Sequence, residues 1–331
     1  MIIGGKTFDY DNHFYIMGIL NVTPDSFSDG GKYYNNDAAI FHVEEMIKEG
    51  ADIIDIGGES TRPGHIKITD REEIERVCPV IEKIKDNFDI PVSLDTYKCN
   101  VAAAGALAGA DLINDIWGLK WDFVKGKYVS DVNDSENINE DINGETGENI
   151  ESNSNLSMAK VVANAGVPCC LMHNRSKGEE GEKKPSLHNA DLSGAKFFGN
   201  RYQEDPFGYS NFIEDVIRDM QESIDIALKA GISKDNIMID PGIGFAKDLQ
   251  QNLVMMNHLY ELCKLGYPVL LGTSRKSMIG LTLDLPVEQR EEGTIATSVI
   301  GYQAGCRIFR VHDVKANLRA LMMTEAILNA G

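Results

Sequence analysis

Basic residues are scarce in this chain of 331 residues, which carries 32 Lys and Arg against 51 Asp and Glu, a formal net charge of −19. A nucleic-acid-binding protein presents a basic patch or stripe, so this balance argues against a nucleic-acid partner. An anionic small substrate is still compatible with it, because a local basic pocket can lie on an acidic protein.

Long hydrophobic runs are also missing. No apolar stretch reaches the ~18 residues that a membrane helix needs, so we expect no membrane partner. The first residues, MIIGGK, lack the basic stretch and long apolar core of a signal peptide. The six cysteines form neither a CxxC pair nor a Cys/His cluster, which argues against a zinc site and suits thiols in a reducing compartment. Together these absences predict a cytoplasmic protein.

Motifs of nucleophilic catalysis are absent as well. The sequence contains no G-x-S-x-G elbow, no phosphate-binding GxxxxGK[ST] loop and no HExxH pattern of zinc proteases. This favours a reaction that has no covalent enzyme intermediate and is driven by ionisation of a leaving group. Such a reaction needs positioning and anion stabilisation more than a strong base.

Short apolar runs alternate with helical patterns along the chain. The run 51–56 is largely apolar, which is typical of parallel strands covered on both faces, and Gly recurs where helices should end, as at Gly50 and Gly109. The expected strands are 14–22, 51–57, 91–96, 112–116, 167–172, 237–240, 268–272 and 307–311. The expected helices are 37–48, 70–87, 98–108, 158–165, 212–230, 249–263, 290–303 and 314–328.

Eight such units predict an α/β fold, a closed (β/α)8 TIM barrel, as one domain over residues 1–331. A doubly wound open sheet is the alternative. It would place a glycine-rich phosphate turn after the first strand, where the sequence has Asn21-Val22-Thr23-Pro24.

Two segments interrupt the alternation and are interpreted as surface insertions. The first, 120–157, is acidic and of low complexity, with eight acids and no Lys or Arg between residues 131 and 155. Its low hydropathy and like charge cannot offset the entropy cost of ordering the chain. The second, 176–210, is a long loop rich in Gly, Lys, Glu and Asn.

Polar residues collect where the expected strands end, which is where barrels of this type place their active sites. Asp95, Asn114 and Asp240 are compact hydrogen-bonding groups. Together they can accept from and donate to a flat heterocycle with an amide edge and an exocyclic amine. A purely internal polar layer of the barrel is the alternative interpretation.

A second group is cationic and consists of Arg62, Lys276, Arg310 and His312. Arg and Lys side chains directed into one mouth form a site for a polyanion such as diphosphate. Arg310 and His312 are two residues apart on the last strand, so both point the same way. Salt bridges to acids on helix faces are the alternative.

Several stretches are similar to the dihydropteroate synthase family of pterin-binding TIM barrels. They are residues 21–31, 55–64, 93–96, 113–115, 240–245, 274–277 and 310–313. The resemblance implies a transferase of folate biosynthesis. The implied reaction condenses 6-hydroxymethyl-7,8-dihydropterin diphosphate with para-aminobenzoate to 7,8-dihydropteroate and diphosphate, by a dissociative substitution. It further implies a homodimer through the barrel helices, and sulfonamide-like arylamines that compete with para-aminobenzoate.

The resemblance also implies residue roles. The pterin ring would contact Asp95, Asn114, Asp240 and Lys276, with Met172 and Phe245 lining its slot. The diphosphate would be held by Arg62, Arg310 and His312 with Thr61, and by a Mg2+ ion that Asn21 reaches. Thr61, Pro63 and Ser277 would shape the para-aminobenzoate pocket, and loops 23–31 and 60–64 would close over the substrates. Arg62, Lys276, Arg310 and His312 would be the catalytic residues.

Two other functions fit parts of this pattern. Methyltransferases that move a methyl group from methyl-tetrahydrofolate to a corrinoid protein share the ring-binding Asp and Asn residues. They need neither a diphosphate grip nor an arylamine loop, so the stretches 60–64 and 310–313 weigh against them. A paralogue that binds pterins without turnover is the third possibility.

Overall fold

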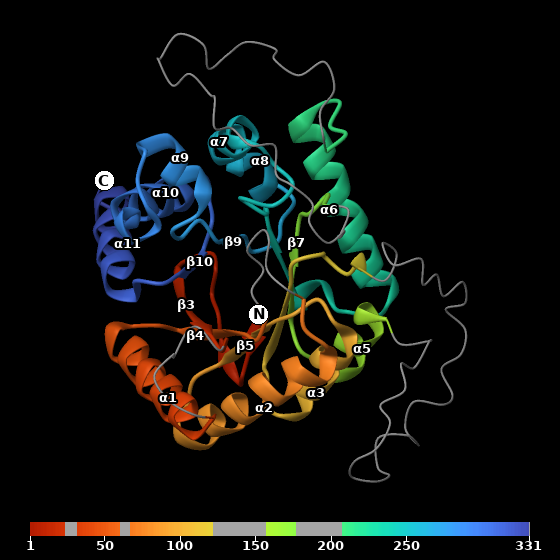
Figure 1. Cartoon of the computed structure of the whole chain (residues 1–331). Helices are drawn as coiled ribbons and strands as arrows, with labels where there is room; N and C mark the ends of the chain where they lie inside the picture. The colour runs from red at the N-terminus through yellow and green to blue at the C-terminus, as the bar shows by residue number, and fades with distance from the viewer. Residues whose placement is uncertain (24–31, 60–66, 122–156, 177–206, 331) are drawn as a thin grey trace.

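A computed structural model of the protein contains a sheet of eight parallel strands surrounded by helices (Figure 1). The structure describes residues 1–23, 32–59, 67–121, 157–176 and 207–330. The sheet order is β8-β7-β6-β5-β4-β3-β10-β9. The strands are β3 (Tyr15–Asn21), β4 (Ile53–Gly57), β5 (Val92–Asp95), β6 (Leu112–Asp115), β7 (Cys169–Met172), β8 (Ile237–Asp240), β9 (Leu270–Leu271) and β10 (Ile308–Val311).

The two edges of this sheet meet. A parallel bridge joins Ile239 of β8 to Val269, just before β9, and the Ile239 N–H donates to the Pro268 carbonyl at 2.9 Å. The predicted closed (β/α)8 barrel is therefore confirmed, and the doubly wound alternative is wrong. No helix in the described ranges is long and apolar enough to cross a membrane.

The helices pack around the strands and bury a continuous apolar layer between helix and strand. They are α1 (Lys32–Glu49), α2 (Asp70–Asn87), α3 (Cys99–Leu107), α5 (Met158–Ala165), α6 (Phe212–Lys229), α7 (Leu249–Asn257), α8 (Leu259–Cys263), α9 (Ser277–Leu283), α10 (Glu291–Ala304) and α11 (Val314–Leu328). The expected helix 249–263 is two helices, because His258 has non-helical dihedrals (φ −114°, ψ 18°). Helix α9 was not predicted.

The chain begins with a second unpredicted element, a hairpin of β1 (Ile2–Ile3) and β2 (Lys6–Thr7). Ile3 and the following Phe8 are buried against inward-facing residues near the start of the barrel strands, including Met17, Ile53 and Met238. The hairpin thus seals the end of the barrel where the strands begin. The opposite end, where the strands finish, holds the polar residues.

Residues 122–156 and 177–206, which make up most of the two expected insertions, lie outside the described residues. The insertion boundaries and the single-domain assignment stay predictions.

A buried ion cluster ties the end of β4 to the β5–α3 connection. The Lys98 ammonium donates to Glu59 Oε2, Glu73 Oε2 and the Ile68 carbonyl, each at 2.7 Å. Glu59 Oε1 also accepts a hydrogen bond from the Tyr97 hydroxyl at 2.7 Å. Lys98 is the shared partner of two carboxylates that are almost fully buried.

We expect Lys98→Met to lower the free energy of unfolding by about 3–5 kcal/mol, because it leaves two buried carboxylates unpaired. The matched control is Lys83→Met, whose ion pair with the exposed Asp37 contributes about 0–1 kcal/mol. Urea denaturation measures both. Equal decreases in the free energy of unfolding of the two variants would show that the buried cluster stabilises the protein no more than an exposed ion pair does.

Candidate active site

The interior of the barrel changes from apolar to polar along the strand direction. Inward residues of the first layer, such as Leu112, Met238 and Ile308, belong to an apolar cluster. Two residues later on the same strands stand Asn114, Asp240 and Arg310. Side chains alternate between strand faces, so these polar groups share the inward face one layer closer to the mouth. The register places Asn21, Gly57, Asp95 and Asn114 at one level.

Arg310 joins two strands on the other side of the barrel. Its Nε donates to Asp55 Oδ2 at 2.5 Å, and its Nη2 donates to Asp95 Oδ2 at 2.6 Å. Asp55 also accepts from the Ser93 hydroxyl at 2.5 Å and from the Asn114 amide at 3.3 Å. The carboxylate partners of Arg310 therefore come from inward-facing strand positions, whereas the alternative interpretation placed them on helix faces.

Asp95 carries the most informative atom of the site. Its Oδ1 is buried, and the described part of the chain offers it no hydrogen-bond partner. Burial raises the pKa of this carboxyl to about 7, and the nearby Asp55 and Glu73 add to the rise, while Arg310 and Lys276 oppose it. A buried acceptor without a partner costs free energy, which a ligand that donates a hydrogen bond can recover.

Two glycines lie next to the polar groups of the mouth. A Cβ added to Gly57 would stand 3.8 Å from Asn21 Oδ1 and 3.9 Å from the Asp95 Cβ. A Cβ added to Gly272, just after β9, would stand 3.7 Å from Asp240 Oδ2 and 3.9 Å from the Arg310 Cβ. A side chain at either position would begin in contact with these polar groups, so glycine keeps further side-chain atoms away from them.

Lys276 reaches the same space from the connection between β9 and α9. Its Nζ donates to the Ile243 carbonyl at 2.5 Å and lies 4.8 Å from the centre of the Phe245 ring. Phe245 packs against an apolar cluster that contains Met172 and Trp117. Burial raises the pKa of Asp240, and Lys276 and Arg310 both oppose that rise, which places Asp240 in the field of the two cations.

The remaining predicted residues divide into two groups. His312 lies beside Ser274, whose Oγ is 2.9 Å from His312 Nδ1, and Ser277 is exposed at the start of α9. Thr61, Arg62 and Pro63 lie outside the described residues. The structure thus brings Asp95, Asn114, Asp240, Lys276 and Arg310 together with Asn21, Met172 and Phe245 around one mouth.

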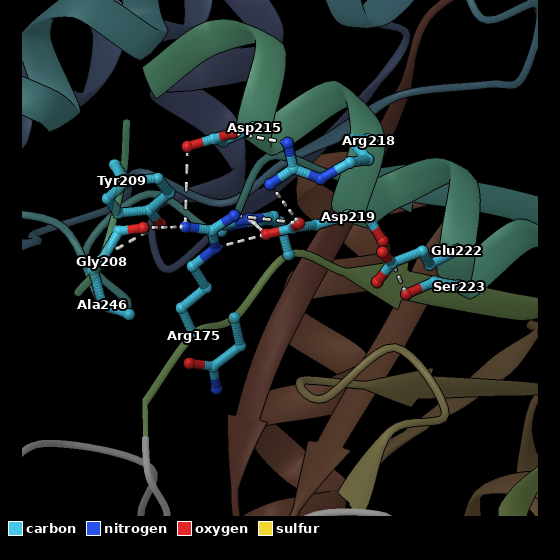
Figure 2. A network of polar contacts seen from close by, with 12 residues as sticks. Arg175, Gly208, Tyr209, Asp215, Arg218, Asp219, Glu222, Ser223 and Ala246 are labelled. Carbon is cyan, nitrogen blue, oxygen red and sulfur yellow. Dashed lines mark hydrogen bonds and ion pairs between the residues drawn. The ribbon is translucent and has the colours of Figure 1, made fainter. Parts of the chain in front are cut away.

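Sequence reasoning missed two groups of buried or half-buried residues. Asp55 had an available signal, because it is the one charged residue within the apolar run Ile53–Gly57. Lys247 and Asp219 gave no motif. They bond to the buried ring of His173, for which a functional role was not favoured. Figure 2 shows the neighbouring part of this network, in which Arg175 reaches across to Asp219 on α6.

A surface hollow lies at the other end of the molecule, beside the hairpin. Lys6, Tyr15, Asp52 and Asp89 line it, and none of the predicted site residues does. Its lining lies where the strands begin, so it is separate from the polar mouth.

Comparison with known proteins gives consistent matches. A family model described as "Pterin binding enzyme" matches residues 17–312. The chain is 48% identical over 329 residues to a dihydropteroate synthase of Clostridium beijerinckii, covering 99% of each chain. It is 44% identical over 322 residues to a dihydropteroate synthase of Bacillus subtilis, covering 97% of this chain and 91% of the relative.

Solved structures agree with these sequence matches. A dihydropteroate synthase from Clostridium difficile, crystallised in the presence of pteroic acid, superimposes with a TM-score of 0.74 at 42% identity, covering 97% of this chain and 99% of the other. A Yersinia pestis dihydropteroate synthase in a sulfonamide drug complex has a TM-score of 0.76 at 36% identity, covering 100% and 99%.

The raised pKa of Asp95 predicts a dependence of stability on pH. Between 3.8 and about 7 the folded protein holds a proton that the unfolded chain has released, so stability falls as pH rises through this window. Asp95→Asn lacks this titration, so we expect its free energy of unfolding to rise relative to that of the wild type by up to about 1.4 kcal/mol for each pH unit within this window. Urea denaturation of both proteins at several pH values measures the difference. A difference that stays constant over the window would contradict the raised pKa.

Proposed function

Because the chain belongs to the dihydropteroate synthases of the pterin-binding enzyme family, transferases of the folate pathway, we propose that its barrel mouth joins a dihydropterin diphosphate to para-aminobenzoate. The observation that carries this proposal is the buried Asp95 Oδ1, an acceptor without a partner in the described part of the chain. It stands beside two further groups, Asn114 and Asp240, that suit the donor edge of a pterin.

The pterin would lie at the barrel mouth beside Gly57 and Gly272, where no side chain covers the polar groups. Asp95 and Asp240 accept from the exocyclic amine and ring N–H groups, and Asn114 can both donate and accept. Phe245 and Met172 supply an apolar wall for the ring, and Lys276 lies over the Phe245 face. A flat heterocycle between a polar edge and an apolar wall is the usual composition of a small-molecule pocket.

The diphosphate would lie at the cationic side of the mouth. The guanidinium of Arg310 has five N–H donors, and its bonds to Asp55 and Asp95 use two of them. His312 follows the end of β10, where its Nδ1 lies 2.9 Å from Ser274 Oγ, and it would add a further donor. Thr61 and Arg62 would complete the grip, as the resemblance implies.

A Mg2+ ion fits the donor set at this mouth. The described residues contain no cluster of three His, Cys, Asp or Glu that could hold a metal by themselves. Mg2+ needs no such cluster, since it commonly keeps several waters and is shared between one or two protein oxygens and substrate phosphates. Asn21 supplies a neutral oxygen at the level of Asp95. When bound, the ion would neutralise charge that develops on the departing diphosphate.

The chemical step is proposed as a dissociative substitution. The bond between the pterin methylene carbon and the diphosphate oxygen breaks, and its electron pair leaves on that oxygen. The para-aminobenzoate nitrogen then forms the new C–N bond and releases a proton, which the departed diphosphate takes up. Arg310, Lys276 and His312, with Arg62, stabilise the leaving anion, so a strong base is not required to activate a neutral aniline.

Para-aminobenzoate would bind beside Ser277, at the exposed start of α9, together with Thr61 and Pro63. The Yersinia pestis relative forms a complex with a sulfonamide drug, and a Xanthomonas albilineans relative has a structure with 4-aminobenzoic acid. By extension, sulfonamides should occupy the same pocket in this chain and compete with para-aminobenzoate.

A homodimer through the barrel helices is part of the proposal. Apolar side chains are exposed on α10 and α11, among them Ile300, Met323 and Ile327. Exposed apolar residues on neighbouring helices favour association with a second copy.

We also propose a cytoplasmic location, because the six cysteines are free thiols, which suits a reducing compartment.

The deciding experiment is a steady-state assay of diphosphate release. We expect release only when the pterin diphosphate, para-aminobenzoate and Mg2+ are all present, with 7,8-dihydropteroate as the second product. Calorimetry should show pterin diphosphate binding that weakens when Mg2+ is withheld, and a sulfonamide should raise the apparent KM for para-aminobenzoate alone. Binding without turnover would identify a pterin-binding paralogue instead, and methyl transfer to a corrinoid would identify the methyltransferase.

Arg310→Ala should reduce kcat by roughly tenfold to a thousandfold, the range for losing a charged contact to a leaving group. The kcat of Arg310→Lys should lie between those of Arg310→Ala and the wild type, because lysine keeps the charge but lacks the planar guanidinium. The control is Arg319→Ala, an exposed position on α11. Unchanged kinetics in a folded Arg310→Ala protein would remove Arg310 from the diphosphate site.

A further inference from the structure

The loop that follows β8 shapes one wall of the proposed pterin slot, and its backbone is unusual. Gly242, Gly244 and Ala246 have φ values of 66°, 85° and 43°, in the left-handed region. A Cβ at Gly242 would collide with the His173 carbonyl, so the loop runs against the end of β7. Ala246 is not a glycine, and a conformation of this kind persists only where the surroundings hold it.

Lys247 holds this loop from inside. Its side chain is 3% exposed, and its Nζ donates to the carbonyls of Gly242 at 3.0 Å and Phe245 at 3.1 Å. The same Nζ lies 2.9 Å from His173 Nδ1. An ammonium has three N–H donors, so these three acceptors account for all of them. No carboxylate is among the three, and burial lowers the pKa of Lys247 to about 7.

His173 presents a hydrogen-bond acceptor to the Lys247 ammonium. Its Nε2 lies 3.1 Å from Asp219 Oδ2 on α6. Burial, with Lys247 as the next cause, lowers the pKa of His173 to about 3, so the ring is neutral at pH 7. A neutral ring that donates from Nε2 to Asp219 has Nδ1 left as an acceptor, and Nδ1 is the atom that faces Lys247.

The contacts close into a circuit, which we call the anchor ring: Lys247, His173, Asp219, Arg175, Tyr209 and Ala246. Arg175 donates to Asp219 through Nε at 2.5 Å and Nη2 at 3.0 Å, and its Cζ lies 4.3 Å from the centre of the Tyr209 ring. The Tyr209 hydroxyl donates to the Ala246 carbonyl at 3.1 Å, which returns the circuit to the residue before Lys247. Figure 2 shows Arg175 between Asp219 and Tyr209, with Ala246 beside them.

The anchor ring fixes the wall of the proposed pterin slot through backbone carbonyl groups. Lys247 holds Gly242 and Phe245 on either side of Ile243, whose carbonyl accepts from Lys276. We propose that Lys247 is a positioning residue for the pterin half of the reaction, which sets the Phe245 ring and the Lys276 ammonium against the pterin while touching no substrate itself. This inference rests on the proposed function. Sites of this kind depend on supporting residues that lock the contacting groups in place.

The test separates positioning from general stability. In Lys247→Met we expect the KM for pterin diphosphate to rise at least about tenfold, while the KM for para-aminobenzoate changes less than about twofold, since a shift of the loop acts on one substrate only. Calorimetry with pterin diphosphate and Mg2+ should show the same loss of affinity. The matched control is Lys229→Met, an exposed lysine at the end of α6, which should behave as wild type. Equal rises in both KM values, or a lower melting temperature with unchanged kinetics, would overturn the proposal.

A milder variant covers the case in which Lys247→Met does not fold. Tyr209→Phe removes the hydroxyl that bonds to Ala246 and should raise the KM for pterin diphosphate by about two- to tenfold, the effect of one hydrogen bond. An unchanged KM there would contradict the anchor ring. If the wild type binds pterin diphosphate without releasing diphosphate, the proposed function fails while calorimetry still decides on Lys247. If the wild type binds no pterin, both proposals fail.

Discussion

The fork of Arg310 between Asp55 and Asp95 is the interaction on which the polar half of the barrel depends. Both carboxylates face inward among buried strand residues, where an isolated charge would be strongly disfavoured. A guanidinium suits this place because it remains charged and offers rigid donors in more than one direction. It links β10 to β4 and β5, so the same contact that neutralises the mouth also ties strands from opposite ends of the sequence.

Arg310 does not satisfy every oxygen of these two carboxylates, and the unsatisfied oxygen indicates what the site can bind. Arg310 takes one oxygen of Asp95, and the other is buried without a partner in the described part of the chain. A folded protein rarely keeps such an atom unless something else pairs with it. The glycines at 57 and 272 place no side chain over the neighbouring polar groups. An unsatisfied acceptor at such a place is therefore better explained by a hydrogen-bonding ligand than by an internal polar layer alone.

The parts of this structure that sequence could predict are those with a repeating physical signal. The apolar runs recur along the chain and a glycine follows most of the helices, and the spans 70–87, 158–165, 237–240 and 314–328 match the structure residue for residue. The hairpin has two-residue strands, too short to show a period, and α9 has seven residues. Asp95 and Asp240 were recognisable as strand-end residues, whereas Lys247 acts through backbone carbonyls that leave no trace in the side-chain pattern.

The balance of charge bears on the proposed diphosphate site. Around the mouth, the carboxyl groups of Asp55, Asp95 and Asp240 outnumber the cations Arg310 and Lys276, although burial raises the pKa of Asp95 and Asp240 and so limits their negative charge. Acids of this kind suit the donor edge of a neutral pterin, but they repel a polyanion. Binding both parts of one substrate then requires positive charge from elsewhere, and a metal ion carried with the diphosphate, together with Arg62, would supply it on the side where the leaving group departs.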